Sequence, residues 1–439
     1  TFRIKTDLAE LRVSRSPNGT LIGAERLLAD SYVKDLPPVK QDRAAPSREL
    51  VVDPKLDYDD QKNQKYKSLQ GAWLNAQGGD RIRLRLDGEI KLDRCLSWWT
   101  KEAELTLSAD PGFHPVLVVD ATEDAPSLLS LFDIQRGKVH VQGLEIRLHS
   151  RQDVGDGAVS ERAAVVRLGG DGECHFKDCL ITLAGGDKSS VKLALAVLRS
   201  ERRNVTQMPH LRLDNCLVRG RGDLVWTRAD QAAEVDLDKS LIALSGSLLN
   251  IASDKEADKD NPQPSSSAEL TLRLGKVTTY LGEHLVRLHA KDAKTLLKTE
   301  FMASACLFLP AGEKALVRLE GMQNLRDKFV WQGSSKNAYG NYTPLLELQA
   351  LDMAGKVDMS MSKRTSLEAW KSDVSRETDS EYNVNLPNLP TADADFTRLS
   401  PSAFQPGDSL KNYGADLAKL RALPALQSHA DAAEPKPVD

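Results

Sequence analysis

A short hydrophobic phrase recurs along the middle of the chain, between residues 131 and 331. It consists of two aliphatic residues, one residue predicted to point outward, and a further apolar or small residue. The phrase returns about every 30 residues, which indicates a repeat architecture. Its copies are residues 131–134, 165–168, 197–199, 224–227, 248–251, 285–288 and 316–319.

A second phrase lies between these copies, in which apolar and polar residues alternate before a turn residue and further aliphatic residues. Alternation with a period of two predicts short strands with one buried face. Helical repeats are disfavoured, because no window carries an apolar stripe across a helix-length span. We therefore predict an all-β fold, a single-stranded right-handed parallel β-helix (solenoid) with two or three strands per repeat. The copies are residues 174–180, 211–217, 235–241 and, less clearly, 270–276.

The flanking segments predict caps for this solenoid. Residues 1–65 are polar and contain several prolines, so we expect an arm or linker with a short helix around residues 24–31. A short amphipathic helix capped by Ser68 is predicted to cover the first coil of a solenoid spanning residues 66–351. Beyond it we expect an irregular C-terminal strap over residues 352–420 and a disordered tail over 421–439.

Composition narrows the classes of function. The chain has 59 basic and 63 acidic residues and a net charge of −4, which speaks against a nucleic-acid partner. It contains no apolar run near the ~18 residues of a membrane span. It begins with Thr1 and not with Met, so we expect a processed product or a fragment of a longer protein.

Five cysteines are present, and four of them lie in the predicted strands, where we expect buried thiols that pack as small hydrophobic groups. A zinc site of Cys174, His175 and Cys179 is disfavoured. Positions 174 and 179 project to opposite faces of one strand, while His175 and Cys179 lie about 13 Å apart at the strand rise. We therefore predict no metal site and no cofactor.

Aligning three neighbouring repeats on Cys179, Cys216 and Ser240 places polar residues in two outward columns. Stacked carboxylates can raise each other's pKa, and a nearby Arg or Lys could complete a glycosidase or an eliminating lyase. The columns are His175, Arg212 and Asp236, then Lys177, Asp214 and Asp238. The candidate catalytic residues are Asp214, Asp236, Asp238, Arg212 and Lys177.

The alternative for these columns is a solvated sheet face on which opposite charges pair across strands, and we favour it. Asp178 and the Asp214-Asn215 pair also fall at predicted turns, where Asp and Asn are expected for backbone reasons alone.

The outward position of the first phrase carries a row of arginines, interrupted by Trp226 and Asn250. This arginine row could bind a polyanion such as a uronate chain, with Trp226 as a stacking platform. Alternatively, the arginine stems cover apolar sheet surface while their charged ends stay in water. Trp98 and Trp99 offer a second stacking candidate, or they cover an early coil with their rings on opposite sides. The candidate ligand-binding residues are Arg167, Arg199, Trp226, Arg287 and Arg318.

Several short motifs resemble known proteins. The segments YKSLQGA (66–72), GDRI (79–82), DFTRLSPSA (395–403) and GADL (414–417) resemble the two ends of pectate-lyase-like β-helix domains. More narrowly, PGFHPVL (111–117), NCLVRG (215–220), WQG (331–333) and NAYG (337–340) are similar to the C-terminal β-helix region of large planctomycete serine/threonine protein kinases. The resemblance covers about residues 66–420, and it implies a non-kinase portion of such a protein, held outside the cytoplasm. Kinase signatures themselves are missing.

Together these patterns favour a non-catalytic binding or spacer module that contacts glycan or protein through its strand faces. The resemblance implies an extracytoplasmic location, in the periplasm or at the cell surface, and a tether to a membrane protein kinase. The competing hypothesis is a polysaccharide lyase or glycoside hydrolase acting on an acidic polysaccharide. Against it, the sequence lacks the Asn-Thr-Asp and Gly-His-Gly signatures of the enzyme families that it resembles.

Overall fold

The chain divides into two units, Thr1–Ser47 and Arg48–Asp439. In the smaller unit the described strands form an antiparallel sheet of β1 (Phe2–Thr6), β2 (Ala9–Arg15) and β3 (Leu21–Ile22). The helix predicted around residues 24–31 lies outside the described residues. Beyond these three strands, the computed structural model describes residues 48–100, 103–121, 129–150, 162–185, 192–198, 208–229, 231–252, 269–290, 296–321, 325–332, 336–352, 357–375, 377 and 379–426.

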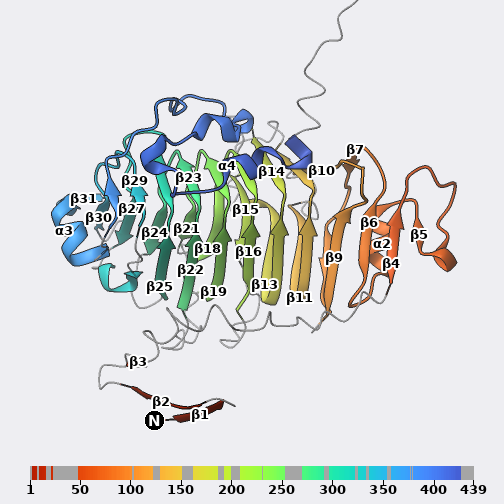
Figure 1. Ribbon diagram of the computed structural model, residues 1–439, viewed down its shortest axis with the longest axis horizontal. Coiled ribbons are helices and arrows are strands. Elements are labelled where there is room, and N and C mark those ends of the chain that lie inside the picture. Colours follow the sequence, from red (N-terminus) through yellow and green to blue (C-terminus); the bar gives the residue numbers. More distant parts are fainter. Residues whose placement is uncertain are drawn as a thin grey trace, which may run out of the picture. The chain divides into compact units, whose positions relative to one another are not determined.

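The larger unit is built from parallel strands that lie side by side along the chain (Figure 1). Strands make up 52% of the structure and helices 13%, so the predicted all-β class is confirmed. The strands fall into three sheets. The first and second sheets belong to one hydrogen-bonded network, joined through the long strands β11 (Ser130–Gln142) and β13 (Arg162–Lys177).

The first sheet combines the first halves of β11 and β13 with shorter strands. These are β8 (Leu96–Trp98), β15 (Lys192–Leu198), β18 (Asp223–Arg228), β21 (Leu249–Ala252), β24 (Val286–Ala290), β27 (Val317–Gly321) and β30 (Leu346–Leu351), with β31 (Val357–Thr365) added antiparallel to β30.

The second sheet combines the second halves of β11 and β13 with a further set of strands. These are β4 (Glu49–Val52), β5 (Lys65–Tyr66), β6 (Arg81–Leu84), β9 (Glu104–Ala109), β16 (His210–Asp214), β19 (Ala233–Asp238), β22 (Glu269–Gly275), β25 (Lys298–Ser304) and β28 (Phe329–Gln332).

The third sheet is separate and has ten parallel strands. They are β7 (Gly88–Lys91), β10 (Pro115–Ala121), β12 (Glu145–Ser150), β14 (Leu180–Gly185), β17 (Leu217–Gly220), β20 (Leu241–Leu244), β23 (Thr278–Leu281), β26 (Leu307–Pro310), β29 (Ala338–Tyr339) and β32 (Glu381–Tyr382).

From β6 to β30 each repeat contributes one strand to each sheet, and each strand pairs in parallel with its equivalent in the neighbouring repeat. The alternation seen in the sequence sets the two faces: Leu211 and Leu213 of β16 are fully buried, whereas Arg212 between them is exposed. Side chains from all three sheets enter one hydrophobic cluster that extends from Leu50 to Val374. This cluster is the main core of the larger unit.

The parallel sheets begin earlier than the predicted start at Tyr66. Strand β4 pairs with β6, so the second sheet includes residues that we had assigned to the polar arm. The predicted capping helix is present as α2 (Leu69–Asn75), and the Oγ atom of Ser68 accepts a hydrogen bond from the amide of Gly71. Its residue Trp73 is buried against Trp98 at 6.0 Å between ring centres.

The C-terminal end of the core is closed by short helical turns. Helix α3 (Leu367–Ala369) continues into a π-helical turn, Trp370–Ser375. The ring of Trp370 is fully buried and lies 5.1 Å from that of Trp331. The larger unit also contains short 3-10 turns at Gln61–Asn63 and Arg326–Lys328.

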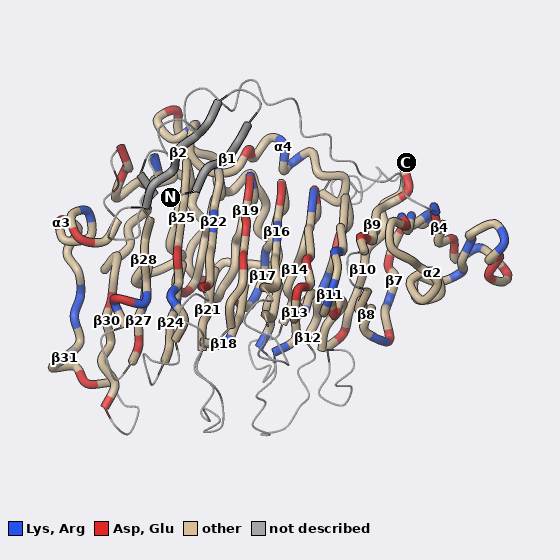
Figure 2. Tube along the Cα trace, turned by 90° about the horizontal axis from the view of Figure 1, so that it is seen from below, with Lys and Arg blue, Asp and Glu red and all other residues tan. Residues whose placement is uncertain are grey.

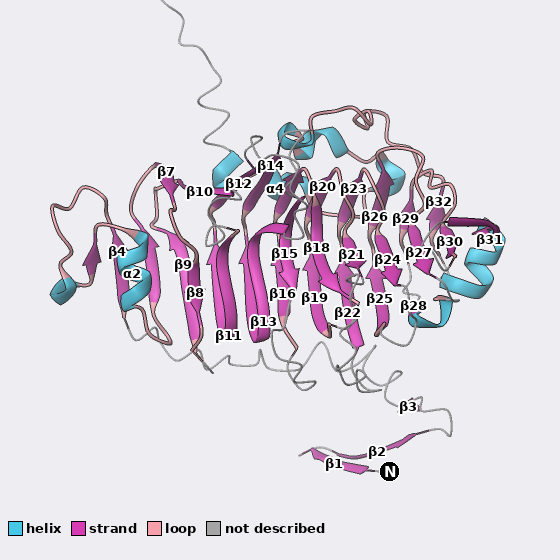
Figure 3. Cartoon of the chain, turned by 180° about the vertical axis from the view of Figure 1, so that it is seen from behind, coloured by secondary structure: helices cyan, strands magenta, loops and turns pink. Residues whose placement is uncertain are grey.

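Residues 384–426 include the end of the strap predicted over residues 352–420 and the first residues beyond it, and we call this segment the strap from here on. The strap packs on the outer face of the third sheet (Figure 3). There its apolar side chains cover Leu217, Leu241, Tyr280 and Leu307 in a second hydrophobic cluster. Its buried residues extend to Ala425, so packing reaches into the segment that we expected to be disordered, and residues 427–439 lie outside the described part. The strap contains the 3-10 turns Phe396–Arg398, Pro401–Phe404 and Asp408–Leu410 and helix α4 (Leu417–Arg421).

Candidate functional site

The second sheet brings the predicted catalytic residues together in the predicted register. His175 pairs with Arg212 and Arg212 with Asp236, while Lys177 pairs with Asp214 and Asp214 with Asp238. Acidic and basic positions are mixed along the strands of this part of the molecule (Figure 2). The stacking in two outward columns is therefore confirmed. Whether these columns could support catalysis depends on the charge and the contacts of each side chain.

Asp236 is held as an ionised partner of two cationic groups. Its carboxylate oxygens lie 2.8 Å from Nε2 of His210 and 3.1 Å from Nη1 of Arg273. Burial raises the pKa of Asp236, but these hydrogen bonds outweigh it and bring the pKa below its ordinary value. A general acid in glycoside cleavage needs the opposite shift. Asp236 is thus suited to fixing two neighbouring strands.

Asp214 and Asp238 lie on an open sheet face. Asp238 forms an ion pair of 2.5 Å with Lys239, which raises the pKa of that lysine. Arg212 and Lys177 are exposed, and none of the five candidate catalytic residues lines the pocket described below. The patch therefore presents its charged groups to the solvent.

The arginine row on the first sheet is real but differs from the prediction at one place. The register runs from Arg167 through Val197, Trp226, Asn250 and Arg287 to Arg318. Val197 therefore takes the place predicted for Arg199, which lies outside the described residues. The error arose because β15 is apolar on both faces: Val197 packs with Ala164 and Ala194 against Trp226 in an outer cluster.

Glu320, which sequence analysis missed, neutralises the end of this row. Its Oε2 atom lies 3.2 Å from Nη2 of Arg287 and 3.1 Å from Nδ1 of His289, and its Oε1 atom lies 2.5 Å from Nε of Arg318. Burial raises the pKa of Glu320, but the hydrogen bond from His289 and the two arginine charges lower it to about 2. The period of two in 317–320 was the available signal, because it places residue 320 on the same face as Arg318.

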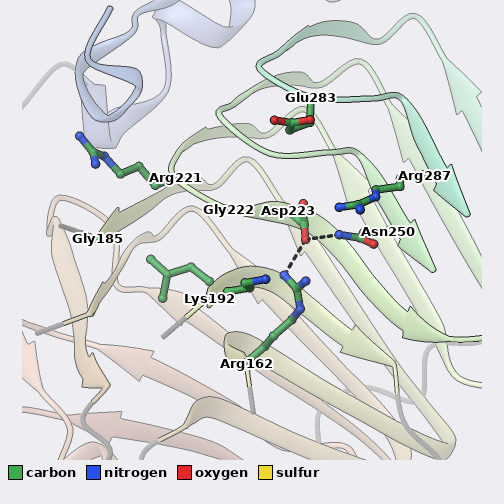
Figure 4. Close-up of a pocket in the computed structure, with 10 residues that line it drawn as sticks. Arg162, Gly185, Lys192, Arg221, Gly222, Asp223, Asn250, Glu283 and Arg287 are labelled. Carbon is green, nitrogen blue, oxygen red and sulfur yellow. Dashed lines mark hydrogen bonds and ion pairs between the residues drawn. The ribbon is translucent and has the colours of Figure 1, made fainter. Parts of the chain in front are cut away.

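A pocket of about 300 Å³ opens beside the arginine row (Figure 4). Most of its polar side chains come from the first residues of first-sheet strands, and the others come from turns that follow third-sheet strands. Four of its side chains are basic and two are acidic. We call it the basic pocket; it is lined by Arg162, Gly185, Lys192, Leu193, Arg221, Gly222, Asp223, Asn250, Glu283 and Arg287.

A buried carboxylate organises the floor of the basic pocket. Asp223 is 6% exposed and accepts hydrogen bonds from the amide of Ser247 (2.8 Å), Nδ2 of Asn250 (2.9 Å) and Nη1 of Arg162 (2.6 Å). The guanidinium carbon of Arg162 also lies 5.3 Å from the ring centre of Trp226. Burial lowers the pKa of Arg162, and Asp223 opposes that shift. Arg162 is therefore fixed in place, and it occupies one face of the ring predicted as a stacking platform.

The turn beneath the pocket requires glycine. Gly222 has a φ of 112°, and a Cβ atom there would lie 2.2 Å from the carbonyl oxygen of Leu193. This close approach brings Gly222 against β15, so that Asp223, the first residue of β18, pairs with Ala194, two residues after Lys192 in the neighbouring β15.

Lys192 and Arg287 are the accessible cations of the basic pocket. Lys192 is exposed, and among the described residues its side chain has no hydrogen-bond or ion-pair partner. Arg287 is 41% exposed and shares Glu320 with Arg318. Arg221 points away from Asp223, as Figure 4 shows. An anion entering the pocket would thus meet Lys192, Arg162 and Arg287.

The cysteines match their predicted role as buried groups. All five are free, and Cys174, Cys179, Cys216 and Cys306 are fully buried. Across the described ranges, no group of three or more His, Cys, Asp or Glu side chains has an arrangement that could hold a metal ion. None of the helices in the described part of the chain is long and apolar enough to cross a membrane.

Fold and site together define an all-β protein of stacked parallel strands with a basic surface pocket. No protein-family model matches the sequence, and a search of curated proteins finds no significant match.

Proposed function

We propose that the larger unit is a right-handed parallel β-helix in which three consecutive strands form one coil. Two observations support this fold: equivalent strands of successive repeats pair in parallel, and one buried cluster receives side chains from all three sheets. Connections between parallel strands of one sheet are right-handed in nearly all proteins, which gives the expected hand. In this fold α2 caps the first coil.

On this scaffold the best-supported function is that of a non-catalytic binding module for an acidic glycan. The basic pocket carries the proposal, because four of its six charged side chains are basic on a chain of net charge −4. Three of these, Arg162, Lys192 and Arg287, lie around Asp223 (Figure 4). Carboxylate and sulfate groups bind guanidinium and ammonium groups through charge-assisted hydrogen bonds. The glycan would lie on the outer face of the first sheet, over the pocket and the arginine row.

A polysaccharide lyase or glycoside hydrolase is the competing function. The stacking of Asp214 on Asp238 favours it, since paired carboxylates are the usual catalytic groups of glycosidases. The ion pairs of Asp236 and Asp238 and the open position of the patch disfavour it.

The motif resemblance supports a wider setting for this module. The chain would form the extracytoplasmic part of a planctomycete serine/threonine kinase-like protein, in the periplasm or at the cell surface. A glycan or protein contacted there would be the extracellular ligand of a tethered kinase. Fractionation of the source cells with an antibody against the chain tests this setting, and recovery in the cytoplasm would contradict it.

The binding proposal is tested by titrating the full chain with hyaluronan and with neutral dextran at two salt concentrations. We expect hyaluronan to bind, dextran not to bind, and the affinity to fall as salt rises. A Lys192→Ala, Arg287→Ala double variant should bind hyaluronan about tenfold more weakly or worse. The control is Lys67→Ala, Lys411→Ala, which also removes two exposed positive charges but lies away from the pocket.

The same titrations separate the two candidate functions when product release is followed. Cleavage of an acidic polymer that disappears in an Asp214→Ala, Asp238→Ala variant would replace the binding proposal with the enzyme. Equal affinities of the pocket variant and its control would remove the basic pocket from the proposal.

A further inference from the structure

We infer that the basic pocket binds one acidic sugar residue, a pyranose with a single carboxylate and free hydroxyl groups. This inference rests on the proposed function and narrows it to a ligand class. The carboxylate would lie among Lys192, Arg162 and Arg287, and the ring hydroxyl groups would donate to Asn250 and Glu283.

The guanidinium group of Arg162 is already oriented before any ligand binds. Arg162 is held by the 2.6 Å hydrogen bond to Asp223 and by the ring of Trp226, and its side chain is only 14% exposed. A guanidinium group that is already oriented loses little side-chain freedom when a ligand binds. Lys192, which is exposed and unpaired within the described residues, can move toward the same anion. The two cations therefore supply one rigid and one adaptable contact.

The pocket also contains acceptors for hydroxyl groups. The Nδ2 atom of Asn250 is used by Asp223, which leaves its Oδ1 atom as an acceptor at the pocket wall. Glu283 is 42% exposed at the rim, and Lys314 lies 3.4 Å from one of its oxygens. Asp223 and Glu283 would repel a small, multiply charged inorganic anion. A sugar acid reduces this repulsion because it carries one charge and several hydroxyl donors.

The size of the pocket favours one ring over a buried stretch of polymer. Its volume of about 300 Å³ lies at the lower end of the range for small-molecule sites. Neighbouring units of a chain would have to continue over the outer face of the first sheet. The pocket thus selects a residue, while the surrounding face contacts the polymer.

The test uses the full chain and four monomeric probes in the same buffer: glucuronate, its methyl ester, glucose and inorganic sulfate. We expect glucuronate to bind, and the uncharged methyl ester and glucose to bind at least about tenfold more weakly. Sulfate should also bind more weakly than glucuronate, because it lacks the hydroxyl donors. Lys192→Met, at an exposed position, should weaken glucuronate binding about tenfold, whereas Lys67→Met should not.

The outcomes distinguish this inference from the proposed function. Equal binding of glucuronate and its methyl ester, or of glucuronate and sulfate, overturns the acidic-sugar site even when hyaluronan still binds. Unchanged glucuronate binding by Lys192→Met overturns the placement of its carboxylate. Loss of binding to every polymer and monomer would reject the proposed function together with the inference.

Discussion

Glu320 is the residue that most changes the meaning of the arginine row. It is 5% exposed and bridges Arg287, His289 and Arg318, so these side chains are balanced from within the protein. At this end the arginine row is therefore part of a structural network of ion pairs. A buried acid of this kind remains favourable only while it is ionised, because protonation removes the partner of two guanidinium groups.

The pKa of Glu320 near 2 predicts a defined pH dependence of stability. A folded-state pKa below the ordinary value of 4.5 stabilises the protein above that pH, and the contribution is lost as the pH falls from about 4.5 to about 2. The free energy of unfolding, measured by urea titration, should decrease over this window by about 2–3 kcal/mol through this group. Glu320→Gln should flatten the dependence. Glu283→Gln, at a more exposed position, should leave it intact, and parallel curves for both variants would contradict the assignment.

Replacing Glu320 should also change the affinity for hyaluronan. In Glu320→Gln, Arg287 loses its acidic partner, and Arg318 keeps only the longer 3.9 Å contact with Glu347. We expect hyaluronan to bind several-fold more tightly at low salt, with a steeper dependence on salt concentration. Titrations of the wild type and the variant at pH 7 check this. An unchanged affinity would show that these two arginines do not contact the glycan.

At the scale of elements, the turns between the second and third sheets repeat one backbone geometry. A single residue with a positive φ directly follows each of β13, β16, β19, β22 and β25; these residues are Asp178 (54°), Asn215 (53°), Lys239 (50°), Lys276 (53°) and Ala305 (53°). The left-handed conformation disfavours side chains other than Gly, Asn and Asp. The first two positions carry the expected residue types, and the last three do not.

Ala305 is therefore a position where glycine should stabilise the protein. Ala305→Gly relieves the left-handed strain, and we expect a gain of about 0.5–1 kcal/mol in the free energy of unfolding. Ala303→Gly is the matched control, because Ala303 lies two residues earlier in β25 and is buried. That change should destabilise the protein by about 1 kcal/mol. Chemical denaturation of both variants gives the comparison, and a loss of stability in both would show that the turn is not strained.

The sequence specified the strands better than the connections between them. Alternation placed His175, Arg212 and Asp236 in one column because the side-chain period of a strand is fixed. It failed at β15, where apolar residues on both faces hid the register and Val197 took the place assigned to Arg199. The basic pocket could not be predicted, since Arg162, Lys192 and Asp223 meet only when three repeats stack. Their contacts depend on loop lengths, which the period does not determine.

A carboxylate joins the last strands to the segment that follows them. Glu377 accepts hydrogen bonds from Nε1 of Trp331 (2.9 Å), Nδ2 of Asn337 (2.9 Å) and the hydroxyl groups of Tyr339 (2.8 Å) and Ser380 (2.8 Å). The donors of Trp331, Asn337 and Tyr339 belong to buried side chains. Removing the acceptor would leave the donors of Trp331 and Tyr339 unpaired, at a cost of about 1–3 kcal/mol for each. The Nδ2 atom of Asn337 would keep its 3.1 Å hydrogen bond to the carbonyl of Ala303.

We therefore expect Glu377→Ala to loosen the C-terminal end before the rest of the larger unit. Hydrogen exchange should increase in β29, β32 and the strap, while exchange in β16 and β19 stays slow. Glu368→Ala, at an exposed position in α3, should leave the exchange pattern unchanged. Uniform acceleration across all strands would indicate that this end does not open independently.

At the scale of the whole molecule, the two largest apolar clusters are formed by different elements. The main core is shared among three sheets and grows with each repeat, so every repeat depends on its neighbours. The second cluster exists only because the strap returns along the third sheet. The strap is anchored where the hydroxyl group of Tyr280 donates to the carbonyl of Pro390 at 2.7 Å and Nη1 of Arg219 donates to that of Leu399 at 2.9 Å. Both contacts join residues more than 100 positions apart, so the strap ties the last segment to the middle of the chain.

Removing the strap should consequently make the molecule associate. A chain that ends at Asn383 would expose Leu217, Leu241, Tyr280 and Leu307 in one continuous patch on the third sheet. Each fully buried side chain of this size contributes about 1.5–3 kcal/mol, and an exposed patch of this kind favours self-association. We expect this truncated chain to form oligomers or precipitate in size-exclusion chromatography. A chain that ends at Leu426 keeps the strap and should elute as the full chain does. Equal elution of both truncated chains would mean that the strap is dispensable and that the apolar face of the third sheet tolerates water.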